Sequence, residues 1–210
     1  DRMSAEAVIA GDSPLWAVLE GFKALGFAGG ASVDDPSLAP AEKALLHCIV
    51  LEELSAGDVG LFITCGLLNI APEIARASGR ADLTEFFGAR DELCCLALTE
   101  PGHGSDIVAF TEPAYRNPRI KPALKCRRDG ANYVLNGQKA AWVSGGTLAG
   151  SGIVFASFEN SPVGFADGAV FLMPFDLPGV SKGKPLEKIG QRALNQGEIF
   201  FDNVRVPQQF

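Results

Sequence analysis

Apolar residues in the first ninety positions recur at helical spacing. After Ser13-Pro14, an N-cap residue followed by proline at the first helical position, apolar side chains return every three or four residues as far as Leu25, and Gly26 ends the run. A Gly-, Asp- and Pro-rich loop is expected next, over residues 29–40. This pattern predicts one amphipathic helix over about 14–25, followed by a loop.

Further helices are expected up to position 89. One should span about Ala41–Ala56, and its middle is apolar on all sides, which predicts burial between other helices. Gly57-Asp58 should break it. The remaining helical segments are expected at Val59–Ser78, with a bend near Pro72, and at Asp82–Ala89.

From Cys94 onward the pattern changes to short runs rich in β-branched and aromatic residues. Turns are expected at Asp129-Gly130 and Asn136-Gly137, because both dipeptides tolerate positive φ. Strands joined by such turns predict an antiparallel barrel or sandwich, so the fold class is α+β, with a helical domain over 1–92 and a β-rich domain over 93–210. The strands are expected at Cys94–Leu98, Leu124–Arg128, Asn132–Leu135, Lys139–Ser144, Ile153–Phe158, Ala169–Pro174 and Glu198–Val204.

Composition narrows the class of protein. The chain has 210 residues, 47% of them hydrophobic, and a formal net charge of −7, which is typical of a globular protein without the basic footprint that nucleic-acid binding needs. A small basic pocket for one phosphorylated ligand stays open. The most apolar stretch, Val59–Ile74, is interrupted by polar residues and is shorter than the ~20 residues of a membrane span. No signal peptide is evident at Asp1–Ile9, so a soluble protein is expected.

The five cysteines are an odd number, form no C-x-x-C motif and lack metal-ligand spacing. They are expected to be buried and reduced, and no metal site is expected. Reduced thiols favour a reducing compartment, the cytoplasm or alternatively the mitochondrial matrix.

The loop Thr99–Asp106, directly after the first expected strand, has an unusual composition. Pro101 fixes one φ, glycines allow the backbone to approach a ligand, and Thr99 and Ser105 place hydroxyls beside exposed backbone N–H groups. This combination suits a flat heteroaromatic ring or a phosphate. A plain turn is the alternative.

A second candidate surface is Trp142-Val143-Ser144, followed by two glycines. A large aromatic side chain there could lie against a planar cofactor, with a hydroxyl next to it. Burial of the tryptophan in the core is the alternative.

These segments together resemble the acyl-CoA dehydrogenase family. The resemblance covers the chain from about Leu15 to Phe210 and is strongest from Cys94 onward. It rests on four motifs in order: Leu96-Ala97-Leu98-Thr99-Glu100-Pro101-Gly102-His103-Gly104-Ser105-Asp106, Asn136-Gly137-Gln138-Lys139 with Trp142-Val143-Ser144, Leu186-Glu187-Lys188-Ile189-Gly190-Gln191-Arg192, and Phe201-Asp202-Asn203-Val204-Arg205-Val206-Pro207.

The resemblance implies a helical N-terminal domain and a β-rich middle domain with FAD at their edge. It implies that Leu96 and Leu98 offer backbone groups and Thr99 a hydroxyl to the flavin ring. Trp142 would cover one face of the ring, and Ser144 would approach its N5. Ser105 would also bind the CoA substrate. The implied FAD-binding residues are Leu96, Leu98, Thr99, Gly104, Ser105, Trp142, Val143 and Ser144.

One departure from the family pattern lies before Trp142. Two residues, Ala140 and Ala141, stand between Lys139 and the tryptophan, where the family has one. A bulge or a shifted register is therefore expected. Alignment on Trp142 keeps the aromatic ring and the hydroxyl, whereas alignment on Lys139 would put Ala141 at the flavin face.

The family's catalytic carboxylate comes from a C-terminal helical domain, which is expected to lie outside this sequence, as are the first residues of the N-terminal domain. The catalytic residue is therefore left unassigned. Glu100 and Asp106 are expected to be structural, bonding loop N–H groups as Asx turns do. His103 is expected to pack over the cofactor phosphates or face solvent, with a general base as the alternative.

The expected function is FAD-dependent oxidation of an acyl-CoA thioester to the 2,3-enoyl-CoA by this chain or by the enzyme of which it is part. Electrons would pass to an external acceptor, and the protein is expected to be a homo- or hetero-oligomer. The alternative is a non-catalytic flavin-binding or scaffolding subunit. Related flavin-dependent oxidation or hydroxylation also stays open, because a scaffold does not fix a reaction.

Overall fold

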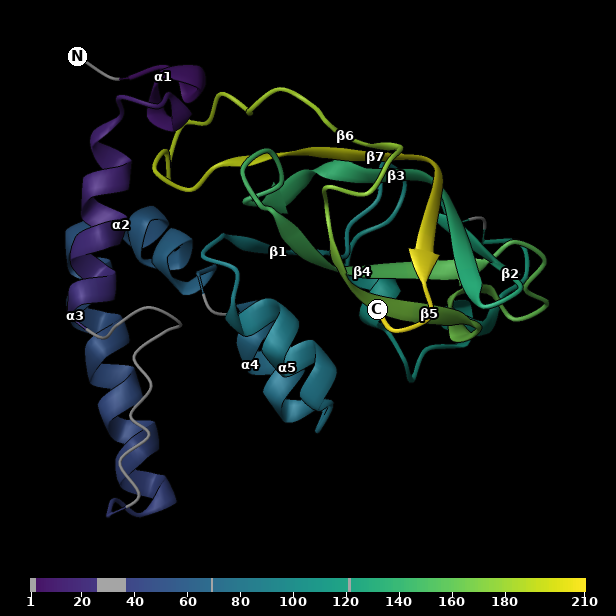
Figure 1. Cartoon of the computed structure of the whole chain (residues 1–210), viewed down its shortest axis with the longest axis horizontal. Coiled ribbons are helices and arrows are strands. Elements are labelled where there is room, and N and C mark those ends of the chain that lie inside the picture. The colour runs from purple at the N-terminus through teal and green to yellow at the C-terminus, as the bar shows by residue number, and fades with distance from the viewer. Residues whose placement is uncertain (1–2, 26–36, 69, 121) are drawn as a thin grey trace.

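The computed structural model describes residues 3–25, 37–68, 70–120 and 122–210. Helices gather at one side of the molecule and a curled sheet at the other (Figure 1). The expected loop at 29–40 lies mostly outside the described residues. The helices are α1 (Ala5–Ile9), α2 (Pro14–Ala24), α3 (Pro40–Gly66), α4 (Ile70–Ala77) and α5 (Ala81–Gly88).

The start of α2 confirms the sequence signal. Ser13 Oγ accepts the N–H of Leu15 at 3.2 Å, and Pro14 occupies the first turn. The short helix α1 was not predicted; it begins with a similar cap, in which Ser4 Oγ accepts the N–H of Ala7 at 3.1 Å. In each cap the serine oxygen accepts a backbone N–H two or three residues further along the chain.

Helix α3 joins two expected helices across a kink. Asp58 has non-helical angles (φ −159°, ψ 109°), so the expected break is present as a bend inside a longer element. The axis turns again by 55° between α3 and α4. This turn confirms the bend expected near Pro72, and Pro72 itself lies within the first turn of α4, where a missing N–H costs nothing.

The first half of α3 is exposed, which contradicts the expected burial. Leu45 and Ile49 are 62% and 45% exposed, and His47 and Cys48 on the same turns are exposed too. Helix α2 instead packs on the second half, where Leu15 and Leu19 join Cys65 in one core cluster. Sequence periodicity correctly indicates an apolar surface here but not whether this chain covers it.

The β-rich part is one seven-stranded sheet in the order β1-β4-β2-β3-β7-β6, with β5 also paired to β4. The α+β class is confirmed, but the sheet is mixed: β4 pairs in parallel with β1 and β2, whereas the other pairs are antiparallel. Strand β6 was not predicted. The strands are β1 (Cys94–Ala97), β2 (Lys125–Asp129), β3 (Asn132–Ser144), β4 (Ser151–Phe158), β5 (Gly168–Pro174), β6 (Val180–Lys182) and β7 (Gln196–Pro207).

Strand β3 is continuous, so the turn expected at Asn136-Gly137 is wrong, whereas Asp129-Gly130 does connect β2 to β3. Gly137 instead lies in a β-bulge of this strand. Its φ is +133°, and a Cβ there would lie 2.0 Å from the carbonyl oxygen of Ala123. A second register shift lies between Lys139 and Val143, as the extra alanine predicted. Such irregularities bend a strand and help to curl the sheet.

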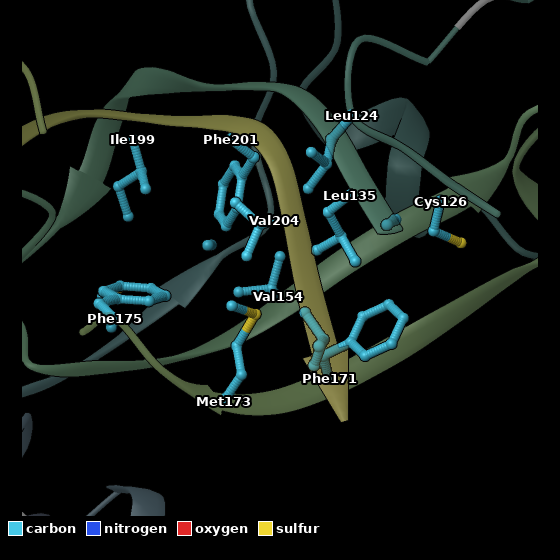
Figure 2. Close-up of a cluster of buried hydrophobic side chains, with 14 of the residues drawn as sticks. Leu124, Cys126, Leu135, Val154, Phe171, Met173, Phe175, Ile199, Phe201 and Val204 are labelled. Carbon is cyan, nitrogen blue, oxygen red and sulfur yellow. The ribbon is translucent and has the colours of Figure 1, made fainter. Parts of the chain in front are cut away.

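The main core fills the concave side of the sheet. Figure 2 shows side chains from β2, β3, β4, β5 and β7 converging on it, among them the buried Leu135, Met173 and Phe201. A second cluster joins the helices to Leu93 and Leu194, and a third packs α4 and α5 against β1 and β4. Cys94 N–H also donates to Leu67 O at 2.8 Å, so the helices and the sheet are held together at β1.

Other general expectations were about thiols, metals and membranes. All five cysteines are free, and four are buried; Cys48 is the exposed exception. Among the described residues, no group of three or more His, Cys, Asp or Glu side chains is arranged to hold a metal ion. No single described helix is long and apolar enough to cross a membrane, and only the bent pair of α3 and α4 reaches that length and composition when taken together.

Candidate functional site

The loop after β1 is closed by its own backbone. Glu100 N–H donates to His103 O at 2.9 Å, and His103 N–H donates to Glu100 O at 3.1 Å. A 3₁₀ helix, Ser105–Val108, follows directly. Pro101 and Gly102 form the exposed tip between the two bonds. The predicted ligand loop is therefore a defined hairpin-like turn with a fixed exit.

Asp106 holds the second half of this loop, as the Asx-type prediction required. Its carboxylate accepts the N–H of Gly104 at 2.7 Å and contacts His103 Nδ1 at 2.7 Å. Burial opposes ionisation of Asp106, but the bonds from His103 and Gly104 outweigh it and hold the pKa below 3.8. The His103 ring also packs edge-on against Phe165, at 5.0 Å between centroids, so the expectation that it faces solvent is wrong.

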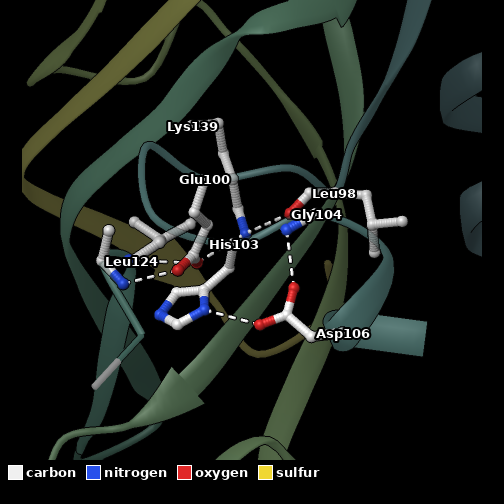
Figure 3. A network of polar contacts seen from close by, with 8 residues as sticks. Leu98, Glu100, His103, Gly104, Asp106, Leu124 and Lys139 are labelled. Atoms are coloured by element: carbon white, nitrogen blue, oxygen red, sulfur yellow. Dashed lines mark hydrogen bonds and ion pairs between the residues drawn. The ribbon is translucent and has the colours of Figure 1, made fainter. Parts of the chain in front are cut away.

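Glu100 forms a buried ion pair with Lys139, which sequence reasoning missed. The Nζ–Oε1 distance is 2.8 Å, and the side chains of Lys139 and Glu100 are 1% and 2% exposed. Glu100 is structural, as predicted, but its N–H donors are Ala123 (2.5 Å) and Leu124 (3.2 Å) in a later segment (Figure 3). Burial lowers the pKa of Lys139, and Glu100 counteracts part of that shift.

Two bonds bring the predicted segments together. Lys139 Nζ donates to Leu98 O at 2.9 Å, and the N–H of Ala140 donates to Thr99 O at 2.9 Å. The structure therefore places the end of β1 beside the part of β3 that leads to Trp142, although the two stretches are about forty positions apart.

Trp142 lies on the surface, and 63% of it is exposed, which excludes a core role within this chain. Leu96 is also exposed, at 47%, although it belongs to an otherwise buried strand. Val143 points into the core at 1% exposure, so only its backbone could meet a ligand. Leu96 and Trp142 are therefore candidates for a ligand or partner surface.

Ser144 is held by a residue that sequence reasoning did not single out. Gln196 Nε2 donates to Ser144 Oγ at 3.2 Å and to Trp142 O at 3.1 Å. Since Oγ acts here as an acceptor, the Ser144 hydroxyl hydrogen is left without an acceptor among the described residues. No local signal marks Gln196, because it reaches Ser144 only through pairing of β3 with β7.

The remaining predicted groups differ in which hydrogen-bond donors and acceptors are still unused. Leu98 N–H donates to Leu96 O at 3.1 Å, and its carbonyl accepts from Lys139. The N–H of Gly104 is taken by Asp106. In the described part of the chain, the hydroxyls of Thr99 and Ser105 have no hydrogen-bond partner. Three hydroxyls and two apolar side chains are therefore available to a ligand: Thr99, Ser105, Ser144, Leu96 and Trp142.

Comparison with protein-family models finds a match to the acyl-CoA dehydrogenase middle domain over residues 95–204. Among curated proteins, the chain is 32% identical over 171 residues to the mitochondrial short-chain specific acyl-CoA dehydrogenase of Rattus norvegicus, covering 79% of this chain and 38% of that protein. It is 30% identical over 169 residues to the mitochondrial isovaleryl-CoA dehydrogenase of Pongo abelii, covering 78% and 37%.

Among solved structures, the chain is similar to a glutaryl-CoA dehydrogenase from Mycobacterium smegmatis in complex with FADH2. The TM-score is 0.67 with 25% sequence identity, over 91% of this chain and 46% of that chain. The chain thus spans less than half the length of each of these three proteins.

Proposed function

This chain belongs to the acyl-CoA dehydrogenase family, and we propose that it is the part of an FAD-dependent acyl-CoA dehydrogenase that holds the flavin ring. One observation carries the proposal: the loop at Leu98–Thr99 is bonded to β3 at Lys139–Ala140, just before an exposed tryptophan and a hydroxyl whose hydrogen is free. The relation to a glutaryl-CoA dehydrogenase described with FADH2 supports the choice of cofactor.

The available groups fit the ring of FAD. Trp142 offers a flat apolar surface, and Leu96 adds a second exposed apolar side chain. The hydroxyls of Thr99 and Ser144 can donate to carbonyl and ring-nitrogen acceptors of the isoalloxazine. We propose that Val143 contributes its backbone alone, because its side chain is buried.

The diphosphate of FAD would have fewer unused hydrogen-bond donors available than the ring. The N–H of Gly104, which we propose for this contact, already donates to the Asp106 carboxylate. A phosphate could take this N–H only if that bond opened, and it would then lie close to a negative charge. The exposed Ser105 hydroxyl is the more accessible donor, and we propose it for both the diphosphate and the CoA thioester.

We propose that the reaction is oxidation of an acyl-CoA thioester to the 2,3-enoyl-CoA. Bound FAD would supply the hydride acceptor. Gln196 occupies an acceptor site of Ser144 Oγ, so the hydroxyl hydrogen can point to an acceptor on the ring. Neither carboxylate of the loop suits the role of base, because Glu100 is paired with Lys139 and Asp106 is held by His103 and Gly104. We assign the base to no residue of this chain.

The proposal includes an external electron acceptor, a reducing compartment and an oligomer. All five thiols are free, which suits either the cytoplasm or the mitochondrial matrix. Exposed apolar side chains on α3, such as Leu45 and Ile49, suit an interface.

Anaerobic titration of the whole, FAD-loaded protein with acyl-CoA thioesters of increasing chain length tests the reaction. The proposal predicts bleaching of the flavin band near about 450 nm with at least one thioester, and no bleaching with CoA alone. Retained FAD that no thioester bleaches would instead favour the scaffolding subunit.

A further inference from the structure

The ion pair between Lys139 and Glu100 is an unusual feature of this sheet. Both side chains are almost fully buried, and the pair lines a cavity of about 260 Å³ whose other walls include Phe155 and Phe165. Buried ion pairs are an inefficient way to stabilise a fold, because two well-packed apolar side chains often serve as well or better. The role of the pair is therefore sought in the groups that it binds.

The groups that the pair binds are all backbone groups near the proposed flavin site. An ammonium has three N–H donors, and Lys139 directs one to Glu100 and one to the carbonyl of Leu98. Glu100 in turn accepts from Ala123 and Leu124, the residues that lead into β2 (Figure 3). One buried pair thus joins the end of β1, the start of β2 and the middle of β3.

Its position in β3 matters because the backbone ladder with β7 is interrupted directly after it, and the Gln196 side chain is what holds Trp142 O from that strand. Lys139 is opposite Ile199, but Val143 is opposite Gly197, so four steps along β3 correspond to two along β7. The residues between, including Trp142, lie on a bulge whose ladder contacts are interrupted. Lys139 is the last ladder residue before this bulge.

We propose that Lys139 is a positioning residue of the flavin site. Its bond to the carbonyl of Leu98 sets the spacing between the backbone at Leu98–Thr99 and the bulge that carries Trp142. Glu100 neutralises the buried charge of Lys139. This inference rests on the proposed flavin function. Lys139 itself is buried, so its role would be to position other groups and not to bind the cofactor directly.

Three variants of the whole protein separate positioning from stability. Lys139→Met alone leaves Glu100 buried without its partner, so loss of folding would be uninformative. The double variant Lys139→Met with Glu100→Gln removes both charges, while the glutamine oxygen can still accept from Ala123 and Leu124. Glu100→Gln alone keeps the bond from Lys139 to Leu98.

Lys182 supplies a matched control. Its Nζ also donates to a backbone carbonyl, that of Ala149 at 2.5 Å, and burial lowers its pKa as it does for Lys139. Lys182→Met therefore removes a lysine that also bonds a backbone carbonyl, is more exposed than Lys139 and belongs to neither proposed flavin segment.

The measurements are the melting temperature of the apoprotein, the Kd for FAD and the visible circular dichroism of the bound flavin. We expect the double variant to melt close to the wild type but to bind FAD at least about tenfold more weakly, with an altered flavin spectrum. Lys182→Met should stay within about twofold of the wild-type Kd. Glu100→Gln, which keeps the bond from Lys139 to Leu98, should lose less affinity than the double variant.

A double variant with wild-type Kd and spectrum would overturn the positioning role. A Glu100→Gln variant with an unchanged melting temperature that loses as much affinity as the double variant, or tenfold where the double variant does not fold, would overturn it as well, because this variant keeps the Leu98 bond. Wild-type protein that binds no FAD would refute the proposed function itself, and the inference with it.

Discussion

Replacement of Trp142 by alanine should separate cofactor binding from folding. Because the indole is 63% exposed, its removal leaves no cavity, and we expect the free energy of unfolding of the apoprotein to change by no more than about 0.5 kcal/mol. Stacking on a flat ring is worth about 0.5–1.5 kcal/mol beyond the buried area. That loss corresponds to a roughly 2- to 12-fold rise in the Kd for FAD, and the area term adds to it.

Quenching of FAD fluorescence on binding gives the Kd, and urea unfolding of the apoprotein gives the stability. Phe110→Ala is the matched control, because Phe110 is an aromatic side chain of nearly equal exposure, 65%, outside both proposed flavin segments. His103→Ala should also cost less affinity than Trp142→Ala, since His103 contacts Asp106 and Phe165.

Equal Kd values for Trp142→Ala and Phe110→Ala would be incompatible with stacking of Trp142 on the flavin. Such a result would mean that the aromatic ring on the bulge does not meet the flavin. The alternative register, in which Ala141 stands at the flavin face, would then be preferred.

Three further predictions follow from burial and charge. Burial raises the pKa of Cys65 and Cys126 to about 11 and that of Cys94 to about 12. Ellman's reagent at about pH 8 should therefore label one thiol per native chain, that of the exposed Cys48. A Cys48→Ser variant should show no fast reaction. The pKa of Asp106 is lower in the folded protein than in the unfolded chain, so its contribution to stability is present above the unfolded pKa and is lost as the pH falls through the folded pKa. The stability gap between wild type and Asp106→Asn should therefore close on acidification, and a gap that stays constant would contradict this. The exposed apolar residues of α3 should make the isolated chain self-associate, and light scattering that reports a monomer at every concentration would disprove it.

Local features of the fold were predictable from the sequence. The cap at Ser13, the turn at Asp129-Gly130 and the change from helices to strands all depend on neighbouring residues. The break at Gly57-Asp58 was also found, as a kink at Asp58, because a residue with extended angles interrupts any helix.

Features decided by distant residues were not predictable. Asn136-Gly137 has the composition of a turn, but pairing with β7 keeps β3 continuous, and the glycine is needed where the chain passes the carbonyl of Ala123. The parallel pairings of β4 depend on the connections between strands, which residue patterns do not reveal. The predicted burial of α3 was wrong for a related reason: an apolar face does not specify which partner covers it.

The candidate site shows the same division. Composition located the loop with Thr99 and the segment with Trp142, because glycines, hydroxyls and an aromatic residue are concentrated there. The roles of Lys139 and Gln196 went unnoticed, since a lysine or glutamine in a strand usually faces solvent and only the folded sheet brings each to its partner.

The most direct test of the flavin site is the visible absorption spectrum of the whole protein after FAD is added and the free cofactor is removed on a desalting column. We expect a retained flavin spectrum, with bands near about 370 and 450 nm, that is reduced in Trp142→Ala and unchanged in Phe110→Ala. A wild-type protein that leaves the column without flavin would show that these residues do not form a flavin site.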